Sequence, residues 1–77
     1  PDRPSIVANL ATVLFQLGQF AASRELCLDV LERQPGAAAL WVRLGNAQSR
    51  LQQAEEALQS YQRALAIDSD DVEALTN

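Results

Sequence analysis

Residues 40–65 read LWVRLGNAQSRLQQAEEALQSYQRAL, and a related copy precedes them at residues 6–31, IVANLATVLFQLGQFAASRELCLDVL. The copies lie about 34 residues apart, a period typical of helical repeat proteins, in which each unit buries its apolar face against its neighbours. The recurring pairs are Ile6 with Leu40, Val7 with Trp41, Leu10 with Leu44, Ala11 with Gly45, Leu17 with Leu51, Val30 with Ala64, and Leu31 with Leu65. The sequence therefore predicts an all-α fold of stacked antiparallel hairpins.

Apolar periodicity predicts four helices and the start of a fifth. The expected ranges are 5–17, 20–33, 37–51, 54–67 and 72–77. Gly18 is expected to end the first helix in the left-handed conformation, and Gln52 takes the matching place in the second hairpin, at a cost of about 1 kcal/mol. Pro35 and Gly36 should separate the two hairpins.

Composition narrows the possible partners. The 77 residues suffice for one small domain, and Cys27 is the only cysteine in a chain without histidine, so neither an internal disulfide nor an ordinary zinc site is expected. Six arginines face ten acids, for a net charge of −4. Such a balance disfavours nucleic acid and anionic membrane as partners. No stretch resembles a signal peptide or a membrane span, so we expect a soluble excerpt of a longer protein, with a cytoplasmic location favoured.

Catalysis has few candidate groups. The chain has no histidine, no lysine and no glycine-rich phosphate loop. The paired carboxylates at 55–56 and 70–71 diverge by about 100° along a helix and do not converge on a substrate. The acidic run 68–71 is a possible cation site, but capping of the following helix is the preferred interpretation. We therefore predict a protein that is not an enzyme and that uses no cofactor and no metal.

One set of residues resembles the tetratricopeptide repeat family: Trp41, Leu44, Gly45, Ala57, Tyr61 and Ala64. A weaker copy in the first repeat keeps Leu10, Ala11, Leu17, Gly18, Phe20 and Pro35, and departs at Val7, Ser23 and Cys27. The resemblance implies a right-handed solenoid fragment in a single domain, 1–77, with repeats at about 4–37 and 38–71 and a further helix at 72–77. The predicted core comprises Leu10, Leu17, Phe20, Trp41, Leu44, Gly45, Ala57, Tyr61 and Ala64.

The resemblance also implies that the first helix of each repeat lines a concave peptide groove. The groove candidates are Asn9, Thr12, Gln16, Val42, Arg43, Asn46 and Arg50, with Ala8, Phe15 and Ser49 on the same helix faces. Arg43 and Arg50 lie roughly 10 Å apart along one helix face and are suited to a carboxylate on a side chain or a free C-terminus. That both arginines are simply solvated is an equally open alternative.

Chaperone-binding members of the family hold a C-terminus with lysines and asparagines. Here Val42 and Ala8 stand where lysine is needed, so that ligand is not expected.

The predicted function is a non-catalytic protein-interaction scaffold. Two alternatives stay open: self-association through exposed repeat ends, where Val72 and Leu75 continue an apolar face, and a targeting domain of a larger enzyme.

Overall fold

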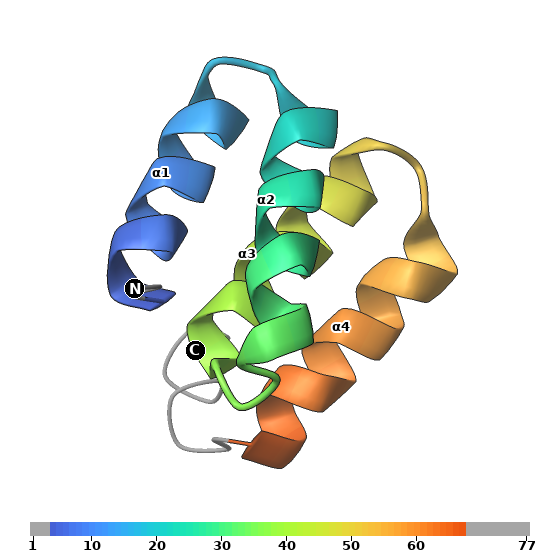
Figure 1. Ribbon diagram of the computed structural model, residues 1–77. Helices are drawn as coiled ribbons and strands as arrows, with labels where there is room; N and C mark the ends of the chain where they lie inside the picture. Colours follow the sequence, from blue (N-terminus) through green and yellow to red (C-terminus); the bar gives the residue numbers. More distant parts are fainter. Residues whose placement is uncertain (1–3, 68–77) are drawn as a thin grey trace.

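The computed structural model describes residues 4–67, which form four helices joined by short turns (Figure 1). The helices are α1 (Pro4–Gln16), α2 (Phe20–Arg33), α3 (Ala38–Arg50) and α4 (Ala54–Ile67). No strand occurs in this range, and the predicted all-α class is confirmed. The expected helix 72–77 with Val72 and Leu75 and the acidic run 68–71 lie outside the described residues.

Both hairpins turn in the same way, although only one of them uses glycine. Gly18 has φ 81° and Gln52 has φ 62°, both in the left-handed region. In the first turn Gln19 N–H donates to the Leu14 carbonyl at 2.9 Å, and in the second Gln53 N–H donates to the Gln48 carbonyl at 2.8 Å. These are the bonds of a Schellman motif, which satisfies carbonyls at a helix end. The predicted left-handed conformations are confirmed.

The helices form two antiparallel hairpins, and α3 is the central element, because it contacts α1, α2 and α4. In Figure 1, α2 and α4 lie in front of α3, and α1 lies beside α2. A core cluster joins the first hairpin to α3 and consists of Ala8, Ala11, Cys27, Val30, Leu31, Leu40 and Leu44. Small residues in this set let the helix backbones approach closely, and the leucines fill the remaining space.

The predicted core is only partly the observed one. Leu44, Gly45, Ala57 and Ala64 are buried, whereas Phe20, Trp41 and Tyr61 are partly buried. Two assignments were wrong: Leu10 is 49% exposed and Leu17 is 66% exposed. Leu10 lies on α1 and Leu17 directly follows it, and no element within residues 4–67 covers this apolar face. The apolar pattern that predicts the helix therefore does not bury these two leucines.

The contact between α3 and α4 depends on a close fit. A Cβ added at Gly45 would lie 2.7 Å from a ring carbon of Tyr61, so glycine leaves the room that this ring occupies. A buried polar pair lies nearby, in which the Ser60 hydroxyl donates to Gln48 Oε1 at 2.6 Å. The second hairpin therefore combines a glycine, an aromatic ring and a satisfied polar pair.

Candidate functional site

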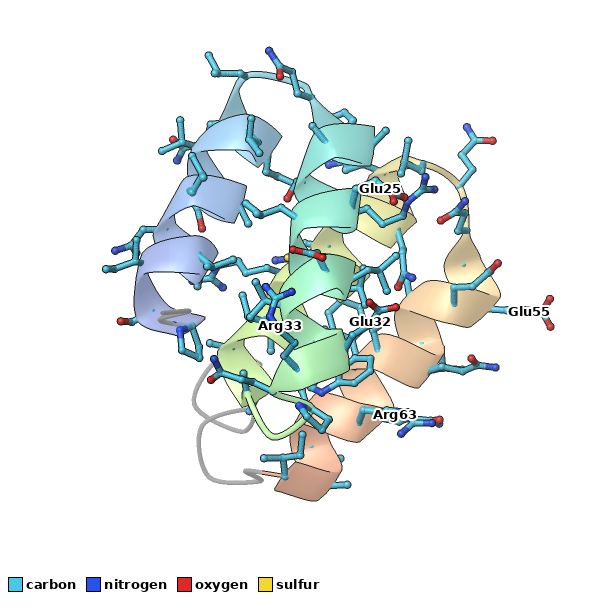
Figure 2. The ribbon with its side chains drawn as sticks, in the orientation of Figure 1. Glu25, Glu32, Arg33, Glu55 and Arg63 are labelled. Atoms are coloured by element: carbon cyan, nitrogen blue, oxygen red, sulfur yellow. The ribbon has the colours of Figure 1, made fainter. Side chains whose placement is uncertain are left out.

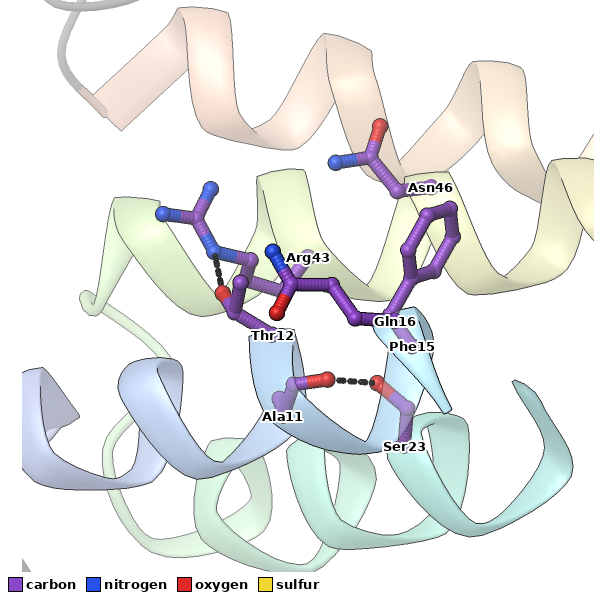
Figure 3. Close-up of a pocket in the computed structure, with 7 residues that line it drawn as sticks. All are labelled: Ala11, Thr12, Phe15, Gln16, Ser23, Arg43 and Asn46. Atoms are coloured by element: carbon purple, nitrogen blue, oxygen red, sulfur yellow. Dashed lines mark hydrogen bonds between the residues drawn. The ribbon is translucent and has the colours of Figure 1, made fainter. Parts of the chain in front are cut away.

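A pocket of about 280 Å³ opens between α1 and α3, and we call it the α1–α3 pocket (Figure 3). Its lining consists of Ala11, Thr12, Phe15 and Gln16 from α1, Ser23 from α2, and Arg43 and Asn46 from α3. Helix periodicity explains this grouping, since side chains three or four residues apart share one helix face. Figure 3 shows the Gln16 side chain lying between Arg43 and Phe15.

Arg43 is held in place by a hydrogen-bonded chain that crosses from α3 to α1. Its Nε donates to Thr12 Oγ1 at 2.8 Å, and that hydroxyl donates in turn to the Ala8 carbonyl at 2.9 Å. The guanidinium carries five N–H donors, and within residues 4–67 only the one on Nε has a partner. The donors of both terminal nitrogens therefore remain for a ligand.

Asn46 is oriented from the other side, by α4. The Tyr61 hydroxyl donates to Asn46 Oδ1 at 2.6 Å, which leaves the amide NH₂ of Asn46 as its open group. Burial raises the pKa of Tyr61 above its ordinary value, so the phenol stays protonated and keeps donating at neutral pH. The bond therefore turns a donor, rather than an acceptor, of Asn46 toward a ligand.

The apolar wall of the pocket is aromatic. Phe15 packs edge-to-face against Phe20, with ring centroids 5.0 Å apart. The guanidinium carbon of Arg50 lies 5.6 Å from the centroid of the Phe15 ring. Such a cation–π contact holds the exposed Arg50 side chain close to the pocket mouth.

The structure brings together only some of the predicted groove residues. Thr12, Gln16, Arg43 and Asn46 line the pocket, whereas Asn9 and Val42 do not, and Arg50 reaches it only through Phe15. Ala11 and Ser23 were missed. Ser23 belongs to a second helix of a repeat, and its hydroxyl donates to the Ala11 carbonyl at 3.0 Å. Ser23 stands where the family pattern has alanine, and this departure is the feature of the sequence that could have pointed to it.

The electrostatics of the site favour a negatively charged ligand. Neither α1 nor α3 carries an acidic residue, and α3 carries Arg43 and Arg50. The positive charge and the free N–H groups suit an acceptor, and a carboxylate matches the planar guanidinium best. The same side chains offer no general base.

Cys27 is a buried thiol that does not line the pocket, and burial makes it unreactive. Burial raises the pKa of the thiol from 9.0 to about 11, against a smaller lowering by the Arg43 charge. Since the thiolate is the reactive form, Cys27 is a packing residue at neutral pH. Within residues 4–67 no three His, Cys, Asp or Glu side chains gather as metal ligands, and no helix is long and apolar enough to cross a membrane.

Comparison with known proteins agrees with the helical repeat architecture. The tetratricopeptide repeat family model matches residues 9–72. The chain belongs to the tetratricopeptide repeat family, whose repeats generally mediate protein–protein interactions.

Three curated relatives carry similar segments. The chain is 40% identical to human FK506-binding protein-like over 68 residues, and this matched segment makes up 88% of the chain. It is 35% identical to mouse FK506-binding protein-like over the same length, and 36% identical over 76 residues to the Arabidopsis thaliana protein CTR9 homolog. The chain spans 20% of the length of either FK506-binding protein-like and 7% of the CTR9 homolog.

Proposed function

We propose that the chain is a non-catalytic interaction module that binds a peptide or protein segment in the α1–α3 pocket through a carboxylate of that segment. The observation that carries the proposal is the Arg43 guanidinium, anchored through Nε on Thr12 with the donors of both terminal nitrogens open. Preorganisation of this kind lowers the side-chain entropy lost on binding. The ligand is a segment with an acidic side chain or a free C-terminus.

The neighbouring side chains add a second element of recognition. The Asn46 amide donates from one side and the Phe15 ring supplies an apolar wall. A bound segment therefore places an acceptor between Arg43 and Asn46 and an apolar group against Phe15. Interfaces commonly combine a charged anchor with an aromatic contact in this way.

The test is a peptide array in which each acidic peptide has a twin with Glu and Asp replaced by Gln and Asn. We expect the chain to bind acidic members only, and Arg43→Gln to lose about tenfold or more in affinity, since a bond to a charged group contributes about 1.5–3 kcal/mol. Arg43→Lys keeps the charge but loses the planar fork, and should also weaken binding.

Arg24→Gln is the matched control, because it removes one arginine from α2, outside the pocket. It should bind like the parent chain. Equal losses in Arg24→Gln and Arg43→Gln, at unchanged helicity by circular dichroism, would contradict the proposed pocket and indicate general charge attraction. Equal binding of the amide twins would exclude the carboxylate.

A second candidate function, self-association by repeat stacking, has its own observation. Ile6, Leu10, Val13 and Leu17 form an exposed apolar stripe along α1, each of them 48–66% exposed. The counterparts of Ile6 and Leu10 on α3 are Leu40 and Leu44, which are covered by the first hairpin. A hairpin from a second copy would cover the α1 stripe in the same manner.

Sedimentation equilibrium over a wide concentration range tests this second candidate. Association that Leu10→Glu abolishes would support stacking, because a charge would then be buried without a partner. A monomer at all concentrations would rule out stacking between copies. Association that persists in the Leu10→Glu variant would place the contact elsewhere.

A further inference from the structure

A second hollow lies on the other side of α3, between α2 and α4, and we call it the α2–α4 groove. Its volume is about 420 Å³. Leu28 and Leu31 line it from α2, Trp41 and Leu44 form its floor, and Glu56 and Arg63 lie on its α4 side. Residues of a helix are about 100° apart, so Trp41 and Leu44 point nearly opposite to Arg43 and Asn46. The groove is therefore a separate surface from the α1–α3 pocket.

Trp41 gives one end of the groove a fixed aromatic surface. Its indole N–H donates to the Pro35 carbonyl at 2.8 Å, and the guanidinium carbon of Arg63 lies 5.4 Å from the ring centroid. A smaller hollow of about 180 Å³ continues past Trp41 to Ala66 and Ile67. Ile67 is 44% exposed, so the apolar surface extends beyond the groove itself.

The other end of the groove is acidic. Leu28 also lines an adjoining hollow with Glu25, Asp29 and Glu32. Arg24 pairs with Glu25 at 2.9 Å, and Arg33 pairs with Asp29 at 3.3 Å. Glu32 and Glu56 form no ion pair or hydrogen bond within residues 4–67, so two uncompensated carboxylates flank the exposed Leu28 from α2 and α4. Figure 2 shows Glu32 on the α4 side of α2, and Glu55 pointing away from α2.

The helices on the two sides of the molecule thus carry net charges of opposite sign. Together α1 and α3 carry two arginines and no acid, whereas α2 and α4 carry five acids and three arginines, a net charge of −2. A ligand chosen by the α1–α3 pocket for its carboxylate is repelled at the acidic end of the α2–α4 groove. Charge complementarity at this acidic end favours a basic side chain.

We propose that the α2–α4 groove is a second docking surface, which takes a segment of a partner protein that carries apolar and basic side chains together. The apolar side chains lie between Leu28 and Trp41 over the floor of the groove. A basic side chain follows at the Glu32 and Glu56 end, where it pairs with the uncompensated carboxylates. The chain can therefore hold an acidic segment on one face and a basic segment on the other.

The test uses a short blocked amphipathic peptide of leucine, alanine and arginine, and its twin in which glutamate replaces each arginine. Trp41 is the only tryptophan of the chain. Its fluorescence and its indole N–H resonance therefore report on the groove directly. We expect the arginine peptide to shift both signals and the glutamate twin to shift neither, with binding weakened by salt.

Matched variants separate the groove from general attraction. Glu56→Gln should weaken binding about threefold, in the range of exposed ion pairs, whereas Glu55→Gln removes the same charge one residue away and should leave binding unchanged. Leu28→Ala should weaken it about fivefold, from the apolar area lost. Leu58→Ala, an exposed leucine of α4 that does not line the groove, is its control.

Four outcomes would overturn the proposal. The first is an equal loss of affinity in Glu55→Gln and Glu56→Gln, which would indicate attraction to net charge alone. The second is unchanged affinity in Leu28→Ala at unchanged helicity. The third is a set of amide shifts confined to Thr12, Arg43 and Asn46, which would place the peptide in the other pocket. Concentration-dependent self-association that hides the Trp41 signal would also overturn it, in favour of a second copy as the occupant.

Discussion

The first helices of the two repeats, α1 and α3, carry the same apolar pattern but bury it to very different extents. Leu10 is 49% exposed, and its counterpart Leu44 is 1% exposed. Ile6 is 58% exposed, and its counterpart Leu40 is fully buried. The side chains are similar, so the difference arises from the neighbours: α2 and α4 cover α3, whereas α1 has α2 and α3 on one side only. Burial in a repeat array is thus a property of position in the stack.

The largest expected effect tests this comparison directly. Leu44→Ala removes a buried leucine and should lower the free energy of unfolding by about 2–5 kcal/mol. Leu10→Ala changes an exposed residue and should alter it by less than about 0.5 kcal/mol. Urea denaturation followed by circular dichroism measures both. Similar losses in the two variants would mean that the α1 stripe is covered in solution.

A second comparison concerns Cys27 and its counterpart Tyr61, both of which titrate with raised pKa. In the unfolded chain the Cys27 thiol ionises near pH 9.0, and in the folded chain near pH 11. Between these values only the unfolded state loses the proton, so stability is complete below pH 9 and falls as pH rises, by about 2–3 kcal/mol at pH 11.

Denaturation at a series of pH values measures this effect. Cys27→Ala should flatten the decline between pH 9 and 11 and leave the contribution of Tyr61, which acts in the same direction at higher pH. An equally steep decline in Cys27→Ala would show that another group is responsible. Rapid alkylation of the folded chain at pH 8 would likewise contradict the buried thiol.

A third comparison concerns the polar pair of the second hairpin. Gln48 and Ser60 are buried and bonded to each other, whereas their counterparts in the first hairpin are Leu14 and Leu26. Ser60→Ala leaves Gln48 Oε1 buried without a donor and should cost about 1–3 kcal/mol. Combining it with Gln48→Leu removes both polar groups and should recover most of the loss. A double variant less stable than Ser60→Ala would contradict this account.

The smallest effect concerns residue size. In the second repeat Gly45 faces the large Tyr61 ring. The corresponding residues of the first repeat, Ala11 and Cys27, belong to one core cluster. The smaller residue of the first-helix pair thus accompanies the larger residue of the second-helix pair. Gly45→Ala should destabilise by about 1 kcal/mol, since strain at the ring exceeds the gain in helix propensity. In a Tyr61→Ala background the same change should stabilise. Stabilisation by Gly45→Ala in the parent chain would mean that the ring moves aside freely.

The helices and turns could be predicted because their signals are local. Apolar periodicity placed all four helix ranges within a residue, and the left-handed positions 18 and 52 followed from the repeat. Most of the pocket followed as well: five of its seven lining residues lie on the predicted helix faces, namely Thr12, Phe15, Gln16, Arg43 and Asn46. Ser23 could not be found in this way, since it enters the site from a second helix.

The sequence by itself determined the period, which is read from the sequence copies directly, and the helix ranges, which depend on residues within about one helical turn of each other. Only the tertiary structure decided which side chains are covered and which arginine is anchored. Leu10 and Leu44 have the same local pattern, and Arg43 and Arg50 share one helix face. In both pairs the environments differ because other helices, distant in sequence, pack close in space. For the arginines these contacts are the Thr12 hydroxyl beside Arg43 and the Phe15 ring beside Arg50.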